Sequence, residues 1–239
     1  MRTVILAVSS LALATPVQAQ SLSDIFRKVE GAVGSLGVTS SSTASKGSGP
    51  AYDIETFNVA GIRLGMTPAE AEAALVERGF QTDFKTVEYT GFANGVRDEA
   101  RRLKQPMPEL PVQQGRFGSF AQDSRGNSVR IEFIHLSEGP RVAEIRLTFD
   151  KETNDYSTLT DDVISSYGTP TIDKRTLLDV FWCSNRGTKC EAEHLHYYLF
   201  GEHTLTLRDG GDRYRLRKSQ IASFFDAPTA DRQRSLLGN

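Results

Sequence analysis

The segment GIRLGMTPAEAEAALVERGF, residues 61–80, constrains the fold most, because it contains a complete set of signals for one short helix. Thr67 is a favourable N-cap, Pro68 suits the first helical position, and Glu70 follows the cap by three residues, as in a capping box. Gly79 can end the helix in the left-handed backbone conformation. These side chains form no reactive set, so we interpret the segment as the start of a folded unit.

The same arrangement is predicted a second time later in the chain. Residues 153–168 place Leu159 and Val163 on one helical face, and Gly168 can end that helix. Each helix precedes four strand-like segments: 83–89, 116–122, 129–136 and 142–149 after the first helix, and 177–183, 190–200, 203–208 and 213–218 after the second. We therefore predict an α+β fold of two helix-plus-antiparallel-meander repeats, with the helices packed on one face of a curved antiparallel sheet.

The stretch LGMTPAEAEAALVERGF, followed by strands, resembles the helix-opening motif of small bacterial envelope domains of the SmpA/OmlA type and of the β-lactamase-inhibitor-protein-like fold. The helix ending SSYGTP in the second unit is similar to the helix end of such repeats. The resemblance implies tandem copies that join their sheets into one concave surface. This chain differs in lacking the lipoprotein cysteine and in carrying an extra segment, residues 91–115. The resemblance implies a fold, and it does not imply an activity.

Residues 1–19 have the pattern of a secretory signal peptide. Arg2 precedes an apolar run over residues 4–14 that is too short to span a bilayer, and small residues precede Gln20. No cysteine follows this run, so we expect no lipid anchor, and no later segment is apolar enough for a transmembrane helix. Removing the segment leaves 27 Lys and Arg against 30 Asp and Glu, a net charge near −3 that disfavours nucleic-acid binding. We expect a periplasmic or secreted protein.

The remaining residues divide into four further segments. Residues 20–50 are predicted to form an amphipathic helix and a flexible Ser/Gly linker. The first repeat is predicted at residues 51–150, and its insertion, residues 91–115, is expected to form a solvated helix and a proline-stiffened loop. The second repeat is predicted at residues 151–218, and residues 219–239 form a C-terminal tail.

The two cysteines, Cys183 and Cys190, are predicted to form a structural disulfide, because exported proteins fold in oxidising compartments. Their C-x6-C spacing lacks the second Cys or His pair of a zinc finger. It also differs from the C-x-x-C of thioredoxin-type redox centres, so a redox role is the minor alternative.

The predicted turns also assign side chains of the second repeat to the two faces of its sheet. If Cys183 faces Cys190, then Trp182 lies on the face opposite Leu205 and Leu207, where we expect no helix to cover it. The predicted partner-binding residues on this face are Trp182, Tyr197, Arg208, Arg213, Arg215 and Arg217. Trp, Tyr and Arg dominate the hot spots of protein interfaces. A β-bulge or a covering segment is the alternative that would bury this face.

A metal site is the alternative function. His194 and His196 are two residues apart on one predicted strand, and Asp179 would lie across from His194. Two imidazoles and a carboxylate suit zinc or iron. Hydrogen-bonded histidines without a metal are the simpler interpretation of the same residues.

The sequence contains no nucleophile elbow, phosphate-binding loop, zinc-protease helix or dinucleotide fingerprint. We therefore predict a non-enzymatic module without a cofactor, which binds another protein of the cell envelope. A metal-binding protein or metal-dependent hydrolase is the alternative, and a carrier of a small apolar ligand held between sheet and helices is the third hypothesis.

Overall fold

The capped helix forms as the sequence predicts. In the computed structural model, which describes residues 51–174, 179–184, 197–201 and 203–226, helix α3 spans Pro68–Glu77. The Thr67 hydroxyl accepts the Glu70 N–H, and the Glu70 carboxylate accepts the Thr67 N–H at 2.7 Å, which completes the capping box. Gly79 has φ of 81°, a left-handed conformation that favours glycine at the end of a helix. A short 3₁₀ turn, η1 (Ile54–Thr56), precedes this helix.

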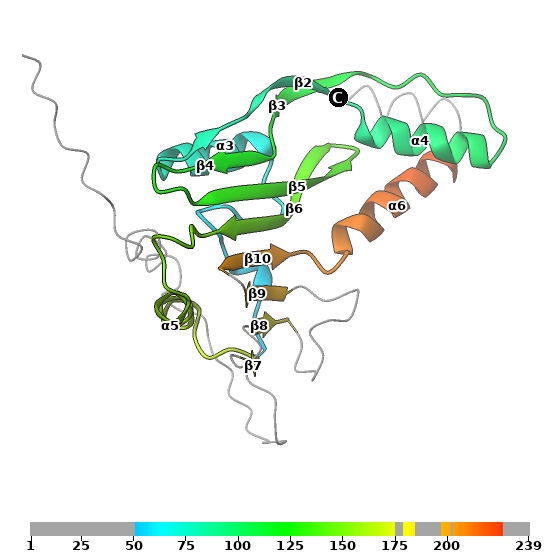
Figure 1. Cartoon of the computed structure of the whole chain (residues 1–239). Helices are drawn as coiled ribbons and strands as arrows, with labels where there is room; N and C mark the ends of the chain where they lie inside the picture. Colours follow the sequence, from blue (N-terminus) through cyan, green and yellow to red (C-terminus); the bar gives the residue numbers. More distant parts are fainter. Residues whose placement is uncertain (1–50, 175–178, 185–196, 202, 227–239) are drawn as a thin grey trace, which may run out of the picture. The chain divides into compact units, whose positions relative to one another are not determined.

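The main sheet has eight strands, and every neighbouring pair in it is antiparallel. Figure 1 shows the strands of this sheet side by side. Their spatial order is β1 (Gln81–Thr82), β4 (Phe120–Gln122), β5 (Ser128–Leu136), β6 (Gly139–Thr148), β10 (Thr204–Arg208), β9 (Tyr197–Gly201), β8 (Asp179–Cys183) and β7 (Ile172–Lys174). The predicted α+β class with an antiparallel sheet is therefore confirmed. Strand β7 was not predicted.

The strand predicted at residues 83–89 is present as β2 (Lys85–Tyr89), and it begins two residues later than expected. Strand β2 pairs with β3 (Gln113–Phe117) in a separate two-stranded sheet. The Asp83 carboxylate accepts the N–H groups of Ser119 and Phe120, both at 3.0 Å. Between the pairs Thr82–Ala121 and Lys85–Phe117, two residues (83–84) oppose three (118–120), which is the count of a β-bulge.

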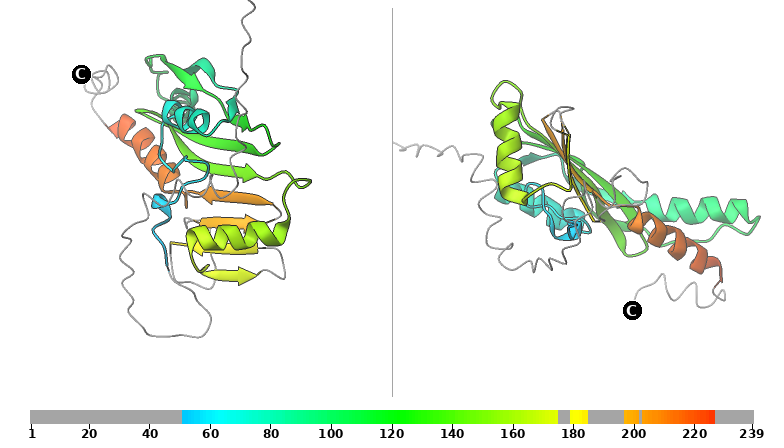
Figure 2. Two further views of the ribbon diagram at one scale, coloured as in Figure 1. Left: turned by 90° about the vertical axis from the view of Figure 1, so that its left-hand side faces the viewer. Right: turned by 90° about the horizontal axis from the view of Figure 1, so that it is seen from below.

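Helices α3 and α5 lie on the same side of the main sheet (Figure 2). Helix α5 (Tyr156–Tyr167) begins where the Asp155 carboxylate accepts the Thr158 N–H, and Gly168 ends it with φ of 82°. The side chains beneath this helical layer come from alternate strand positions and are at most 3% exposed: Val129, Ile131, Ile145, Leu147, Leu205 and Leu207. Alternation of this kind leaves every second side chain of the central strands on the other face.

Each of these two helices is followed by four strands of the main sheet, β1, β4, β5 and β6 after α3, and β7 to β10 after α5. The fourth strands, β6 and β10, pair with each other, with Leu205 opposite Leu147. This arrangement differs from the predicted one, which counted residues 213–218 as a strand. Internal sequence repetition remains a prediction.

The strand predicted at residues 213–218 is wrong, because these residues belong to helix α6 (Asp212–Asp226). The helix therefore also takes up the first part of the predicted tail, residues 219–226. The Asp209 carboxylate accepts the N–H groups of Asp212 and Arg213 at 3.0 and 3.1 Å, and so satisfies donors at the helix start.

The insertion contains the predicted helix, α4 (Gly91–Arg102), which packs against α6. It is not fully solvated, because Val96 and Ala100 are buried. Gly95 allows the close approach: a Cβ there would lie 2.7 Å from an Arg217 nitrogen and 2.8 Å from the Ile221 Cδ1. Segments far apart in the sequence thus meet beside the sheet.

Candidate functional site

The pairing of β8 with β9 overturns the predicted faces of the second unit. Cys183 lies opposite Tyr197, whereas the prediction placed it opposite Cys190. The difference is seven residues, and an odd shift in register moves every side chain of a strand to the other face. Trp182 therefore shares a row across the sheet with Tyr198, Leu207 and Ile145.

Trp182 is consequently a core residue, and the prediction that it binds a partner is wrong. The side chain is 0% exposed, and its indole N–H donates to the Gly168 carbonyl at 3.0 Å. Its ring lies against Tyr167 at the end of α5, with the centroids 6.3 Å apart. Tyr197 belongs to β9, but its side chain lies outside the described residues.

Three of the predicted partner-binding arginines lie on α6 instead of a strand. The Arg213 guanidinium pairs with Asp209 at 3.0 Å and with Glu55 at 3.5 Å. Arg215 pairs with Asp212, and Arg217 donates to the Gly91 carbonyl at 2.9 Å. These side chains stabilise the start of α6 and its contact with α4, and the predicted single surface is not assembled. Arg208, on β10, remains on the sheet.

The geometry assumed for the metal site is also wrong, because Asp179 lies opposite Gly201. His194 and His196 fall outside the described residues, and within those residues no three His, Cys, Asp or Glu side chains gather as metal ligands. Cys183 is buried beside Phe181. Cys190 lies outside the described part of the chain, so the disulfide remains a prediction.

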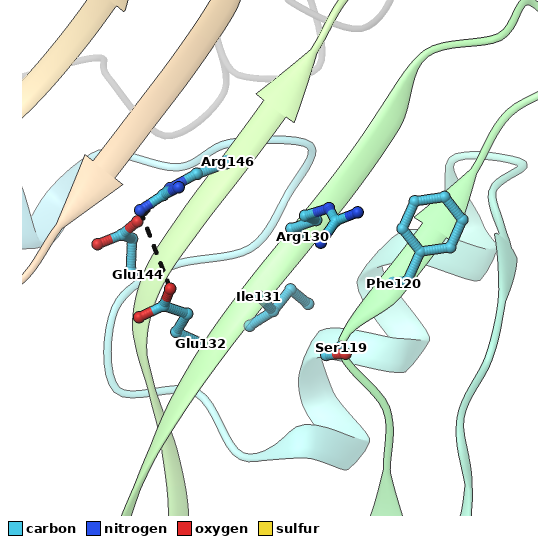
Figure 3. A pocket seen from close by; sticks show the side chains of 7 residues that line it. All are labelled: Ser119, Phe120, Arg130, Ile131, Glu132, Glu144 and Arg146. Atoms are coloured by element: carbon cyan, nitrogen blue, oxygen red, sulfur yellow. Dashed lines mark hydrogen bonds and ion pairs between the residues drawn. The ribbon is translucent and has the colours of Figure 1, made fainter.

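The sheet face opposite the buried row of core side chains is polar over its central strands. We call it the open face and define it by Phe120, Ser128, Arg130, Glu132, Glu144, Arg146, Thr148, Thr204, Thr206 and Arg208. Across it, Arg130 lies opposite Arg146, and Glu132 lies opposite Glu144. A hollow of about 290 Å³ lies on this part of β4, β5 and β6, and Figure 3 shows the charged side chains that line it.

Glu144 is the buried anchor of the open face. Its side chain is 3% exposed, while those of Arg146 and Arg208 are about half exposed, 50% and 51%. Arg146 donates a hydrogen bond to one carboxylate oxygen, and the Arg208 Nε lies 2.9 Å from the other. That second oxygen accepts no well-aligned hydrogen bond from the described residues, so the Arg208 contact is mainly electrostatic. Two guanidinium groups therefore neutralise the buried Glu144 carboxylate.

Arg130 differs from the other two arginines of the open face. Its guanidinium carbon lies 5.9 Å from the centre of the Phe120 ring, a cation–π distance. Among the described residues no carboxylate lies within ion-pair distance of it. Figure 3 shows the side chain between Arg146 and Phe120, which come from the two neighbouring strands. Arg130 is thus an exposed guanidinium of the open face that no acid of the described residues neutralises.

The sequence contained a signal for this face that the prediction did not use. In SVRIEFIHL, Arg130 and Glu132 alternate with Val129 and Ile131, and GPRVAEIRLT repeats the alternation with Glu144 and Arg146. A period of two indicates half-buried strands with a charged outer face.

No family model, no curated protein and no solved structure matches this chain. The resemblance to SmpA/OmlA-type domains therefore remains a prediction. Among the described helices, none combines the length and the apolar character that crossing a membrane requires.

Proposed function

We propose that this protein is an exported, non-enzymatic binding module of the cell envelope and that it binds a protein partner through the open face. The observation that carries the proposal is the position of this face, on the central strands and on the side away from α3 and α5. The predicted class of function is kept, but of the predicted partner-binding residues only Arg208 belongs to the open face.

The charge pattern favours a protein partner over a nucleic acid. Three arginines are interleaved with Glu132 and Glu144, so the face carries only a small positive excess. A phosphate-binding surface needs clustered Lys and Arg without carboxylates between them. Complementary positive and negative groups are typical of protein interfaces, where they set the specificity and orientation of the partner.

The state of the carboxylates favours binding over acid–base catalysis. Glu144 is held by two guanidinium groups, and the Glu132 carboxylate is 58% exposed and lies 3.9 Å from the Arg146 guanidinium. A general acid or base must come within hydrogen-bond reach of the proton that it transfers. Glu144 is buried and its two oxygens face Arg146 and Arg208, so its position suits an ion-pair anchor of the open face.

A photo-crosslinking amino acid at Thr148 tests this proposal. Thr148 is exposed on the open face, one row from Arg146, and its hydroxyl shares a hydrogen bond of 3.3 Å with that of Thr204. Irradiation in the cells that produce the protein should yield one discrete adduct, and substitution of Arg130 by Glu should abolish it. The matched control carries the same amino acid at Val76, 57% exposed on α3, and should give no such adduct.

Two results would overturn the proposal. One is the absence of any adduct from Thr148. The other is an equal yield of the same adduct from Val76, because this would place the partner on the helical side of the sheet.

A further inference from the structure

We propose that Arg130 and Phe120 form a subsite for a single carboxylate, presented by an Asp or Glu side chain on an acidic segment of the partner protein. This inference rests on the proposed function, because it names the chemistry that the open face recognises. Its central contact is Arg130, which is not among the partner-binding residues predicted from the sequence.

The charges around Arg130 favour a negatively charged ligand. Arg130 lies opposite Arg146 in the β5–β6 pair, and like charges placed opposite each other destabilise a sheet. Arg146 is compensated by Glu144 and Glu132. Arg130 has no such compensation among the described residues, so a bound carboxylate would supply the missing negative charge.

The Arg130 guanidinium also has the shape that suits a carboxylate. The Phe120 ring lies under the Arg130 guanidinium and restricts its orientation, while the edges of the guanidinium remain available as hydrogen-bond donors. An arginine held in this way can form two parallel N–H···O bonds with one carboxylate. Part of the entropy cost of ordering the side chain is then already met before the partner binds.

The size of the hollow suits one side chain. The hollow of about 290 Å³ is lined by Ser119, Phe120, Arg130, Ile131, Glu132, Glu144 and Arg146. Sites that enclose a free small molecule are mostly apolar and usually have roughly 300–1,000 Å³. A charged hollow at the lower limit of that range suits one inserted side chain, whose remaining chain stays outside on the sheet surface.

The test measures the binding of a fluorescein-labelled peptide with the repeat Gly-Ser-Glu to the full chain by fluorescence anisotropy at low salt. A peptide with Gln in place of Glu differs from it only by the missing negative charge. If the charge is what Arg130 recognises, this peptide should not bind. Free sodium acetate at the same carboxylate concentration should compete poorly, and this arm separates a peptide-borne acid from a free one.

The decisive variant is Arg130→Gln, which should weaken binding of the Glu peptide about tenfold, as expected for the loss of one charge-assisted contact. Arg63→Gln is the matched control, because it removes one exposed positive charge that lies outside the open face, and its affinity should stay within about twofold. Arg130→Lys keeps the charge but loses the planar donor pair, so its affinity should fall between the two.

The inference is overturned if Arg130→Gln and Arg63→Gln weaken binding equally, or if the Gln peptide binds as tightly as the Glu peptide. It also fails if the Glu peptide does not bind at all while Thr148 still yields its crosslinked adduct. In that case the proposed function stands and only the carboxylate subsite is wrong. Loss of the Thr148 adduct, in contrast, removes the proposed function itself.

Discussion

Trp182 illustrates how one side chain changes its role with strand register. It is the only tryptophan of the chain, it is fully buried, and its N–H is satisfied by the Gly168 carbonyl. Buried tryptophans that satisfy this donor contribute both apolar area and a hydrogen bond to the core.

We expect Trp182→Ala to lower the free energy of unfolding by about 3–5 kcal/mol, the usual cost of truncating a buried aromatic residue. Urea denaturation followed by far-ultraviolet circular dichroism measures this change. Tyr214→Ala is the control, because Tyr214 is 54% exposed on α6 and its removal should cost less than about 0.5 kcal/mol. A loss of less than about 1 kcal/mol for Trp182→Ala would contradict the core assignment.

His135 is a half-buried histidine where β5 meets the start of α4. Its ring lies 5.7 Å from the Phe117 ring and 6.3 Å from the Tyr89 ring, measured between centroids. Its Nδ1 is buried and accepts or donates no hydrogen bond among the described residues. Burial lowers the pKa of His135 below 6.5, and the nearby Arg217 guanidinium lowers it further.

The direction of this pKa shift predicts a pH dependence of stability. Between pH 6.5 and the lower pKa of His135 in the folded protein, His135 is protonated to a greater extent in the unfolded chain than in the folded one. The free energy of unfolding therefore falls as the pH falls. We expect wild-type protein to be less stable at pH 5 than at pH 7, and His135→Leu to reduce that difference. Urea titrations at both pH values measure it. An unchanged difference in the variant would show that His135 is not responsible.

At the scale of elements, the helix signals were readable wherever a cap and a stop lie close together in sequence. Thr67 and Glu70 at α3, and Gly168 at α5, act within a few residues of the helix that they bound. The Asp155 cap of α5 was not predicted, and the helix was expected to begin at residue 153. Helix α6 was missed for a physical reason. Arg213, Tyr214, Arg215, Leu216 and Arg217 alternate as in a strand, but Tyr214 and Leu216 are exposed, so this alternation does not report a buried face.

The start of α6 depends instead on Asp209, whose side chain is fully buried and holds Arg213 as well as two helix N–H groups. We expect Asp209→Ala to destabilise the protein by about 1–3 kcal/mol, because it removes a cap and leaves Arg213 with only the longer contact to Glu55. Hydrogen exchange should also accelerate over residues 212–226. Asp226→Ala, at the exposed end of the same helix, should leave both quantities nearly unchanged. Unaltered exchange in Asp209→Ala would contradict this role of Asp209.

At the scale of the whole molecule, the sheet order could be predicted only in part. The β5–β6 hairpin could be predicted from the sequence, because a short turn, residues 137–138, connects two strands with strong polar–apolar alternation. The β8–β9 register was not, because thirteen residues, 184–196, separate these strands and the cysteine spacing gave the wrong alignment. A seven-residue error is odd, so it reversed the faces and misplaced the candidate site.

The open face was missed for the related reason that it needs the long-range pairing of β6 with β10 to form. Arg130, Arg146 and Arg208 come from β5, β6 and β10, and their proximity follows from the β6–β10 pairing between the two halves of the sheet. Local patterns predict which side chains point away from the core, and the strand order decides which of those side chains are neighbours.

The most direct measurement of the central claim is a two-dimensional ¹⁵N–¹H spectrum of the arginine Nε–Hε groups, recorded while the full chain is titrated with the Gly-Ser-Glu peptide. Assignment uses Arg130→Gln, Arg146→Gln and Arg63→Gln. Binding at the open face predicts a saturable shift of the Arg130 signal, a smaller shift of Arg146 and none of Arg63. A saturable shift confined to arginines of α4 or α6, with Arg130 unmoved, would contradict it.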